Sequence, residues 1–189
     1  MSVYLGLDGD DALRDSLMER LSGRPSIAQT LSIAHEAIDD AQVLNALLSL
    51  IYTAGDPLRW RVAWVLVKVT EMCPALLIDQ RGALGALVIR PDVPYGLKRL
   101  LYGVLYNMRD ADEIDVALLN DLLESMVCLQ APPGVQALAM KLAARMCSMD
   151  EGLWSEFCCI VQSMELEYYS PGVRASVRHC LKNKDKKKL

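Results

Sequence analysis

The stretch Pro133-Gly-Val-Gln-Ala-Leu-Ala-Met-Lys-Leu-Ala-Ala-Arg-Met146 decides the fold class. Its apolar side chains recur at intervals of three and four residues, which places them on one face of an α-helix. The proline stands at the start, where the backbone N–H that it lacks would have no partner inside the helix. The stretch therefore predicts an amphipathic helix that begins at Pro133 and buries one side.

The same helical period runs through nearly the whole chain, and strict alternation of the strand type is almost absent. Val43–Ile51 and Ile114–Met126 repeat the pattern clearly. Only Val3–Leu7 and Leu84–Ile89 have a composition that also suits a short extended piece. The periodicity predicts about ten helices of about 12 to 17 residues. Beyond those led by prolines at turns, helices are expected to open near Asp10, Asp39, Pro74, Asp112 and Asp150.

Helix-opening prolines recur along the chain at Pro25, Pro57, Pro94, Pro133 and Pro171. The intervals between them are 32, 37, 39 and 38 residues, and each interval holds two helices. Asp56 and Ser170 directly precede their prolines and are expected to cap the helices that follow. A two-helix unit that recurs at such a period is typical of an α-solenoid.

The proline-led helices carry a family resemblance. Pro171-Gly-Val-Arg-Ala175, followed by Leu181, resembles the opening of the second helix of a HEAT repeat, with its proline, aliphatic, basic and small residues. Pro133–Ala137 is similar, with Gln136 in place of the basic residue, and Asp56–Ala63 keeps the acid-proline opening, an arginine and an alanine. The resemblance covers about residues 10–182. It implies an all-α fold, a right-handed α-solenoid of about five HEAT-like (armadillo-type) helix pairs.

Two details extend the resemblance. The run Arg61–Leu66 is similar to a stretch of short bacterial HEAT-like proteins. Val62–Val69 is apolar around its whole circumference except at Lys68, so this helix is expected to be covered on most sides. We expect one repeat domain over residues 1–182 and a flexible basic tail over residues 183–189. The tail is expected to be solubilising, with contact to nucleic acid or anionic lipid as the alternative.

Charge is distributed unevenly along the sequence. The whole chain carries a net charge of −4, and residues 1–181 carry −8. Residues 57–109 hold eight basic and three acidic side chains, whereas residues 110–167 hold two basic and eleven acidic ones. An acidic body argues against generic duplex binding, because neutralisation of phosphates supplies most of that affinity. We therefore expect no nucleic acid as the main partner.

Motifs of catalysis and of metal binding are missing from the sequence. The two histidines, His35 and His179, stand on predicted helices without a nucleophile in dyad geometry. No phosphate-binding loop and no Cys-x-x-Cys pair occurs. We therefore name no catalytic residue, cofactor or metal, and we expect the protein to be no enzyme.

The six cysteines stand mostly among apolar residues, where a free thiol behaves as a small hydrophobe. The sequence opens without a basic leader, and no apolar run is long enough to span a membrane. These features predict a reduced, cytoplasmic protein without a membrane span.

Cations and aromatic residues recur on the proline-led helices, which line the concave face in HEAT-like stacks. Stacked in that way, they would form a basic ladder for a partner, because tyrosine and arginine are typical of binding hot spots. The alternative is that the cations are merely solvated and the tyrosine rings belong to the core. The candidate partner-binding residues are Arg59, Trp60, Arg61, Tyr95, Lys98, Arg99, Tyr102, Lys141, Arg145, Arg174 and Arg178.

Three functional hypotheses follow. The first is a non-enzymatic α-solenoid scaffold that binds a protein or peptide on its concave face. The second is a nucleic-acid-binding protein related to HEAT-like alkylation-repair glycosylases, in which Arg59, Trp60 and Arg61 would grip DNA. The third is a homo-oligomer in which the acidic segment 110–167 docks on the basic segment 57–109 of a neighbour.

Overall fold

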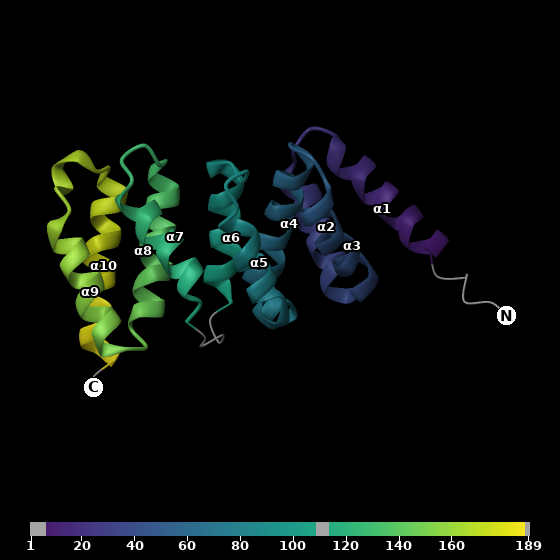
Figure 1. Cartoon of the computed structure of the whole chain (residues 1–189). Coiled ribbons are helices and arrows are strands. Elements are labelled where there is room, and N and C mark those ends of the chain that lie inside the picture. The colour runs from purple at the N-terminus through teal and green to yellow at the C-terminus, as the bar shows by residue number, and fades with distance from the viewer. Residues whose placement is uncertain (1–6, 109–113, 188–189) are drawn as a thin grey trace. The chain divides into compact units, whose positions relative to one another are not determined.

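A computed structural model describes residues 7–108 and 114–187, with side chains described over 11–108 and 114–182 (Figure 1). Within these ranges the chain forms ten α-helices and two short 3₁₀-helices and no strand, which confirms the all-α prediction. The elements are α1 (Leu7–Ser22), α2 (Ile27–Asp39), α3 (Ala41–Thr53), α4 (Leu58–Met72), η1 (Pro74–Gln80), α5 (Arg81–Val88), α6 (Tyr95–Asn107), α7 (Val116–Val127), α8 (Pro133–Cys147), α9 (Glu151–Ser163), η2 (Leu166–Tyr168) and α10 (Pro171–Lys187).

The chain divides into two compact units, Met1–Leu77 and Ile78–Leu189. Helices α1 to α4 belong to the first unit, and helices α5 to α10 belong to the second. The expected division into a domain over residues 1–182 and a tail over residues 183–189 stays a prediction. The backbone of α10 is helical through Lys187, so this helix crosses the expected boundary.

In the first unit, α4 is the central helix and packs against α1, α2 and α3. Val62, Val65 and Leu66 are fully buried, which explains why this helix is apolar on nearly every side. Lys68, the one charged residue of the stretch Val62–Val69, forms an ion pair with Glu71 on the same helix. The expectation that α4 is covered on most sides is confirmed.

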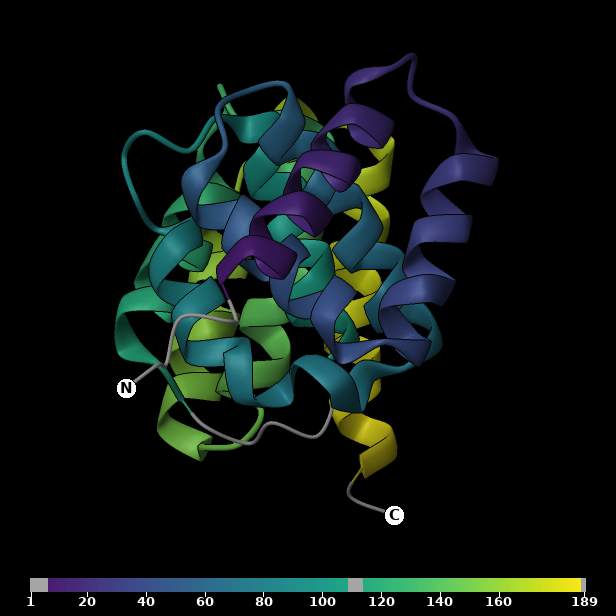
Figure 2. The same cartoon turned by 90° about the vertical axis from the view of Figure 1, so that its right-hand side faces the viewer.

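In the second unit, α8 is the central helix and packs against α6, α7, α9 and α10. Figure 1 shows α8 beside α7, α9 and α10, and in Figure 2 the yellow helix α10 runs along the vertical of the view. Leu97 of α6, Leu142 of α8 and Val173 of α10 are fully buried. Burial of such a side chain contributes roughly 1.5–3 kcal/mol, so the α6–α8–α10 layer is held mainly by aliphatic packing.

Several helices begin with side-chain caps of the kind that the sequence predicts. Ser170 accepts a hydrogen bond from the Val173 N–H at 3.3 Å and caps α10 as predicted. Asp40, Asp115 and Asp150 cap their helices in the same way. The predicted cap at Asp56 is wrong, because α4 begins at Leu58 after Pro57 and has no side-chain cap.

The region between α4 and α6 departs from the sequence prediction. Pro74 opens a 3₁₀-helix rather than an α-helix, and the α-helix that follows, α5, has only eight residues. The extended alternative for Leu84–Ile89 is wrong, because residues 84–88 belong to α5 and the buried Leu84, Leu87 and Val88 follow a helical period. Residues 3–6 and Asp112 lie outside the described residues.

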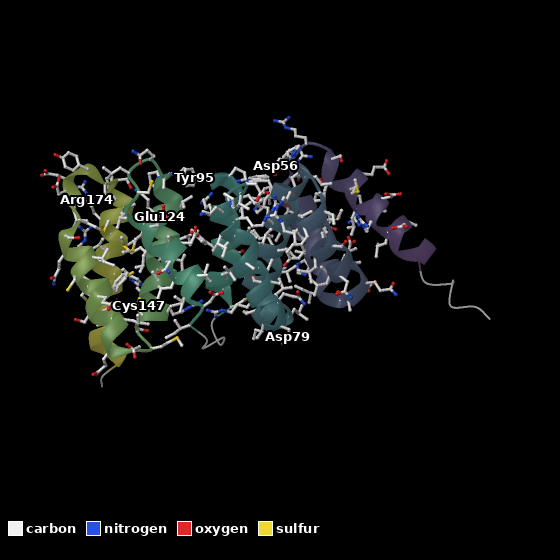
Figure 3. All side chains as sticks on the ribbon, in the orientation of Figure 1. Asp56, Asp79, Tyr95, Glu124, Cys147 and Arg174 are labelled. Atoms are coloured by element: carbon white, nitrogen blue, oxygen red, sulfur yellow. The ribbon has the colours of Figure 1, made fainter. Side chains whose placement is uncertain are left out.

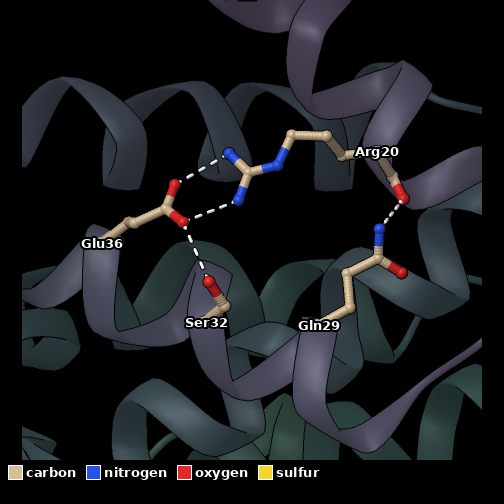
Figure 4. Close-up of polar contacts among 4 residues, drawn as sticks. All are labelled: Arg20, Gln29, Ser32 and Glu36. Atoms are coloured by element: carbon tan, nitrogen blue, oxygen red, sulfur yellow. Dashed lines mark hydrogen bonds and ion pairs between the residues drawn. The ribbon is translucent and has the colours of Figure 1, made fainter.

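An ion pair fastens α1 to α2 in the first unit (Figure 4). The Arg20 guanidinium donates two hydrogen bonds to the Glu36 carboxylate, at 2.7 and 2.6 Å. Ser32 donates to the same carboxylate at 3.1 Å, and the Gln29 amide donates to the Arg20 carbonyl. The bidentate bond from Arg20 holds the pKa of Glu36 below its usual range, although partial burial acts in the opposite direction.

The variant Glu36→Gln is expected to lower the free energy of unfolding by about 0.5–1 kcal/mol at neutral pH, a small value because both side chains are more than a third exposed. Because the pKa of Glu36 is lowered on folding, this contribution is present above the unfolded pKa of about 4.3 and is lost as pH falls through the folded value. Denaturant unfolding between pH 3 and 7 would measure it. In a variant that already carries Arg20→Gln, the change Glu36→Gln should lower the free energy of unfolding little further. An equally large loss in that variant would show that Glu36 does not act through Arg20.

Candidate partner-binding site

Three of the predicted cations bind backbone carbonyls of the chain itself. Arg59 is buried and donates from Nε to the Ile51 carbonyl at 3.1 Å, near the end of α3. Arg61 donates to the Leu21 carbonyl at the end of α1. The last four carbonyls of a helix have no partner within it, and a guanidinium can supply the missing donors. The Arg59 side chain thus lies in the core of the first unit, and its role in partner binding stays a prediction.

Arg145 performs the same task in the second unit. Its guanidinium donates to the carbonyls of Tyr106 at 2.6 Å, Leu105 at 2.9 Å and Met108 at 3.4 Å. It also lies 5.3 Å from the centre of the Tyr106 ring, within the range of a cation–π interaction. Arg145 on α8 thus closes the carboxyl end of α6, so its side chain contributes to packing between successive helix pairs.

Lys98 and Tyr102 of α6 form a polar cluster with α7 rather than a surface. Lys98 Nζ pairs with Asp121 at 2.7 Å, and the Tyr102 hydroxyl donates to the second oxygen of Asp121 at 2.5 Å. The same hydroxyl lies 2.9 Å from the Ser125 Oγ. Tyr102 is fully buried, and burial together with Asp121 raises the pKa of its phenol. The Tyr102 ring is thus part of the core, and the partner-binding role of Tyr102 stays a prediction.

Trp60, the remaining candidate of the first unit, is half-buried on α4. Its ring centre lies 5.6 Å from that of Trp64, with the two planes tilted by 47°. Such a tilted pair is a favourable aromatic packing geometry. The binding role of Trp60 stays a prediction.

Five predicted residues of the second unit remain at the surface: Tyr95 and Arg99 on α6, Lys141 on α8, and Arg174 and Arg178 on α10. We call these five the even-helix surface. Tyr95 is 40% exposed, Arg99 and Arg178 are exposed, and Lys141 and Arg174 are half-buried. Among the described residues, the four cations have no side-chain hydrogen bond or ion pair. Their binding role stays a prediction, and they are the candidates that the fold leaves available.

The place of Arg99 depends on a glycine of the next helix pair. A Cβ built on Gly134 would lie 2.9 Å from Nε and 3.1 Å from Cδ of Arg99, so the arginine lies against the bare backbone at the start of α8. Any larger residue at position 134 would displace the Arg99 side chain. The glycine of Pro133-Gly134 therefore positions a surface cation.

A second surface feature was not found from the sequence. Four apolar or aromatic side chains are exposed where helices of the second unit begin and end: Tyr95 (40%), Val127 (36%), Leu129 (56%) and Tyr168 (64%). We call them the loop patch. Tyr169, next to Tyr168, donates its hydroxyl to the Val127 carbonyl at 2.8 Å. The Tyr95 hydroxyl lies 3.8 Å from the Cys128 Sγ, so the start of α6 lies next to the turn that follows α7.

Figure 3 locates this end of the second unit. Tyr95, Glu124 and Arg174 are at its upper end in the view, and Cys147 is at the opposite end. The sequence signal for the loop patch is weak, because Leu129 stands in a turn and Tyr168 ends the short 3₁₀-helix η2, both outside the α-helical period. An apolar residue in a turn is the feature that would have indicated it.

No constellation of catalytic groups is formed by the described residues. His35 and His179 are both exposed, on α2 and α10. None of the six cysteines, all within the described ranges, forms a disulfide bond. Burial raises the pKa of Cys147 and that of Cys180 to about 11, so both thiols stay protonated at neutral pH and are poor nucleophiles. Within the described ranges, no group of three or more metal-ligating side chains occurs.

Among the helices that the structure describes, none combines the length and the apolar composition that crossing a membrane requires.

Helices of successive pairs are linked by hydrogen bonds between residues that are one repeat apart in sequence. Arg61 and Leu21 are 40 residues apart, Arg145 and Leu105 are 40 apart, and Tyr169 and Val127 are 42 apart. These separations are close to the proline period, so equivalent positions of successive helix pairs meet.

Comparison with known proteins agrees with this repeated architecture. A family model described as a HEAT repeat domain matches residues 17–184. No curated protein and no solved structure matches the chain. The family match spans most of the sequence and includes the starts of all five proline-led helices. The chain therefore belongs to the HEAT repeat family and is an all-α solenoid built from helix pairs.

Proposed function

We propose that this protein is a non-enzymatic scaffold that binds a protein or peptide partner on its even-numbered helices, the helices that line the concave face of a HEAT stack. HEAT repeats commonly mediate interactions between proteins. The observation that carries the proposal is the even-helix surface. Its four cations and one tyrosine lie on helices of one packed layer, and no side chain in the described ranges forms a hydrogen bond or an ion pair with any of the four cations.

The residue types of this surface suit protein recognition. Tyrosine and arginine are enriched in hot spots, because each joins a large contact area to a polar end. The loop patch adds exposed apolar side chains at this end of the second unit, and gathered apolar side chains of this kind are typical of interaction sites. A cytoplasmic location belongs to the same proposal, because six free thiols suit a reducing compartment.

The nucleic-acid hypothesis receives less support. Of the three residues that it needs, Arg59 is buried and Arg61 donates to the Leu21 carbonyl, so neither is available to phosphates in this state. Only Trp60 is left, and a single half-buried ring is no cationic groove.

The variant Tyr95→Ala/Arg99→Glu is expected to reduce the recovery of partner proteins captured from cell lysate by about tenfold or more, because hot-spot residues each contribute about 2 kcal/mol or more. Quantitative mass spectrometry of the captured proteins would measure this. The matched control is Tyr52→Ala/Arg90→Glu, which removes a tyrosine of nearly equal exposure (39%) and reverses another exposed arginine. Equal capture by both variants would contradict a binding role for the even-helix surface.

A further inference from the structure

Helix α10 carries a row of cations along one of its faces. Arg174, Arg178 and Lys182 are four residues apart and therefore lie above one another on one side of the helix. Arg174 is half-buried, and Arg178 and Lys182 are exposed. The opposite side of α10 carries Val173, Ser176 and Cys180, which are buried. We call the three cations the α10 stripe.

The α10 stripe takes no part in the polar contacts among the described residues. None of its three side chains makes a hydrogen bond or an ion pair with any residue in 11–108 or 114–182. This differs from Arg59, Arg61, Lys98 and Arg145, each of which is bound to a carbonyl or a carboxylate. A packed helix needs a polar side, but a uniform positive row next to an acidic body is more than solvation requires.

The four-residue spacing of the stripe continues in the sequence. Beyond Lys182, the sequence places Lys186 at the same four-residue spacing, and Lys182–Lys188 contains five lysines and one aspartate. The helical backbone continues to Lys187, so this spacing is that of a helix.

The spacing of the stripe matches an extended peptide. Four residues of α-helix rise by about 6 Å, and two residues of extended chain span about 6.6 Å. Successive cations of the stripe are therefore at nearly the same interval as alternate side chains of a strand-like peptide. A peptide with Asp or Glu at every second position would pair its carboxylates with the stripe in register.

We infer that the α10 stripe binds an extended acidic segment, rich in Asp and Glu, of the protein partner. This inference rests on the proposed scaffold function and names the chemistry of its partner. Recognition is electrostatic, so it provides specificity and rapid association and weakens with added salt.

Two other polyanions fit the surface less well. Duplex DNA carries one charge per about 1.7 Å of its axis, so the eleven acidic residues of 110–167 repel it much more strongly than they repel a peptide charged at every second residue. An anionic membrane attracts helices that insert an apolar face, but in residues 171–182 no large apolar side chain is exposed. Both polyanions serve as competing probes in the test.

The test uses the full chain and a labelled ten-residue peptide of alternating Glu and Ala, with alternating Gln and Ala as the neutral peptide. Fluorescence polarisation should show binding of the acidic peptide only, and the binding should weaken several-fold between 50 mM and 500 mM NaCl. The variant Arg174→Glu/Arg178→Glu should weaken it by about tenfold or more, because attraction is replaced by repulsion. The control Arg24→Glu/Arg90→Glu changes the net charge by the same amount at exposed arginines elsewhere and should leave the affinity unchanged.

Arg174→Lys/Arg178→Lys keeps the charge and should keep most of the affinity for the acidic peptide. This result would show that replacing both arginines does not by itself abolish binding. The inference is overturned if the reversed variant binds as tightly as the wild type, or if a DNA duplex or a phosphatidylserine vesicle binds the stripe more tightly than the peptide. If the peptide does not bind while Tyr95→Ala/Arg99→Glu still loses its captured proteins, the scaffold function stands and the acidic partner is wrong. If capture is also unaffected, the scaffold proposal fails as well.

Discussion

Replacement of Tyr102 by alanine is expected to lower the free energy of unfolding by about 3–5 kcal/mol, the range for removing a large aromatic side chain from a core. Tyr102 has no exposed surface, and it joins α6 to α7 through Asp121 and Ser125. Its loss creates a cavity and leaves the Asp121 carboxylate with Lys98 as its remaining partner. Denaturant unfolding followed by circular dichroism would measure the change.

Tyr102→Phe separates the two contributions. It keeps the ring and removes the hydroxyl, so we expect a loss of about 1.5–3 kcal/mol, the range for a hydrogen bond to a charged group. If Tyr102→Phe were as stable as the wild type, the hydroxyl would not be bonded to Asp121. If Tyr102→Ala cost less than 1 kcal/mol, the buried position of the ring would be wrong.

Arg145→Met is expected to lower the free energy of unfolding by about 2–3 kcal/mol, because three carbonyls at the end of α6 lose a charged donor and the Tyr106 ring loses its cation. Methionine keeps much of the aliphatic length, so the loss reports mainly on the guanidinium. Equilibrium unfolding and hydrogen exchange at the α6 end would both detect it.

The matched control is Lys141→Met, on the same helix and also half-buried, with no hydrogen bond or ion pair among the described residues. We expect a change within about 0.5 kcal/mol there. Arg145→Lys should recover only part of the loss, because an ammonium cannot reach three carbonyls with the planar fork of arginine. Equal destabilisation by Arg145→Met and Lys141→Met would show that the carbonyl contacts contribute nothing measurable.

The architecture was predictable because it depends on local features. The helical period in Val135–Met146 and the prolines at helix starts act within a few residues, and their recurrence predicted helix pairs and the HEAT resemblance. Two helix starts differ from the prediction. Asp56 precedes Pro57 but caps nothing, and Pro74 opens a 3₁₀-helix, because cap and turn geometry depend on how the chain is held at both ends.

The candidate site was predictable only in part. Tyr95, Arg99, Lys141, Arg174 and Arg178 are at the surface as expected, whereas Arg59 and Tyr102 are buried and Arg61, Lys98 and Arg145 bind groups of the chain itself. All of these stand on proline-led helices, and nothing in their spacing separates the two sets. The repeat period does carry a clue, because an arginine placed about 40 residues after a helix end is positioned to bind its carbonyls.

The sequence by itself determined that the chain is all helical, that its helices come in pairs and where most of them begin, because periodicity, proline and capping side chains act over one helical turn. Only the tertiary structure decided which of the described cations bind carbonyls at helix ends and which lie at the surface without such a bond. The reason is that a carbonyl without a partner and the guanidinium that satisfies it lie on different helices, and their meeting depends on how those helices pack. The exposure of Leu129 and Tyr168 was decided in the same way, by the neighbours that each turn does or does not have.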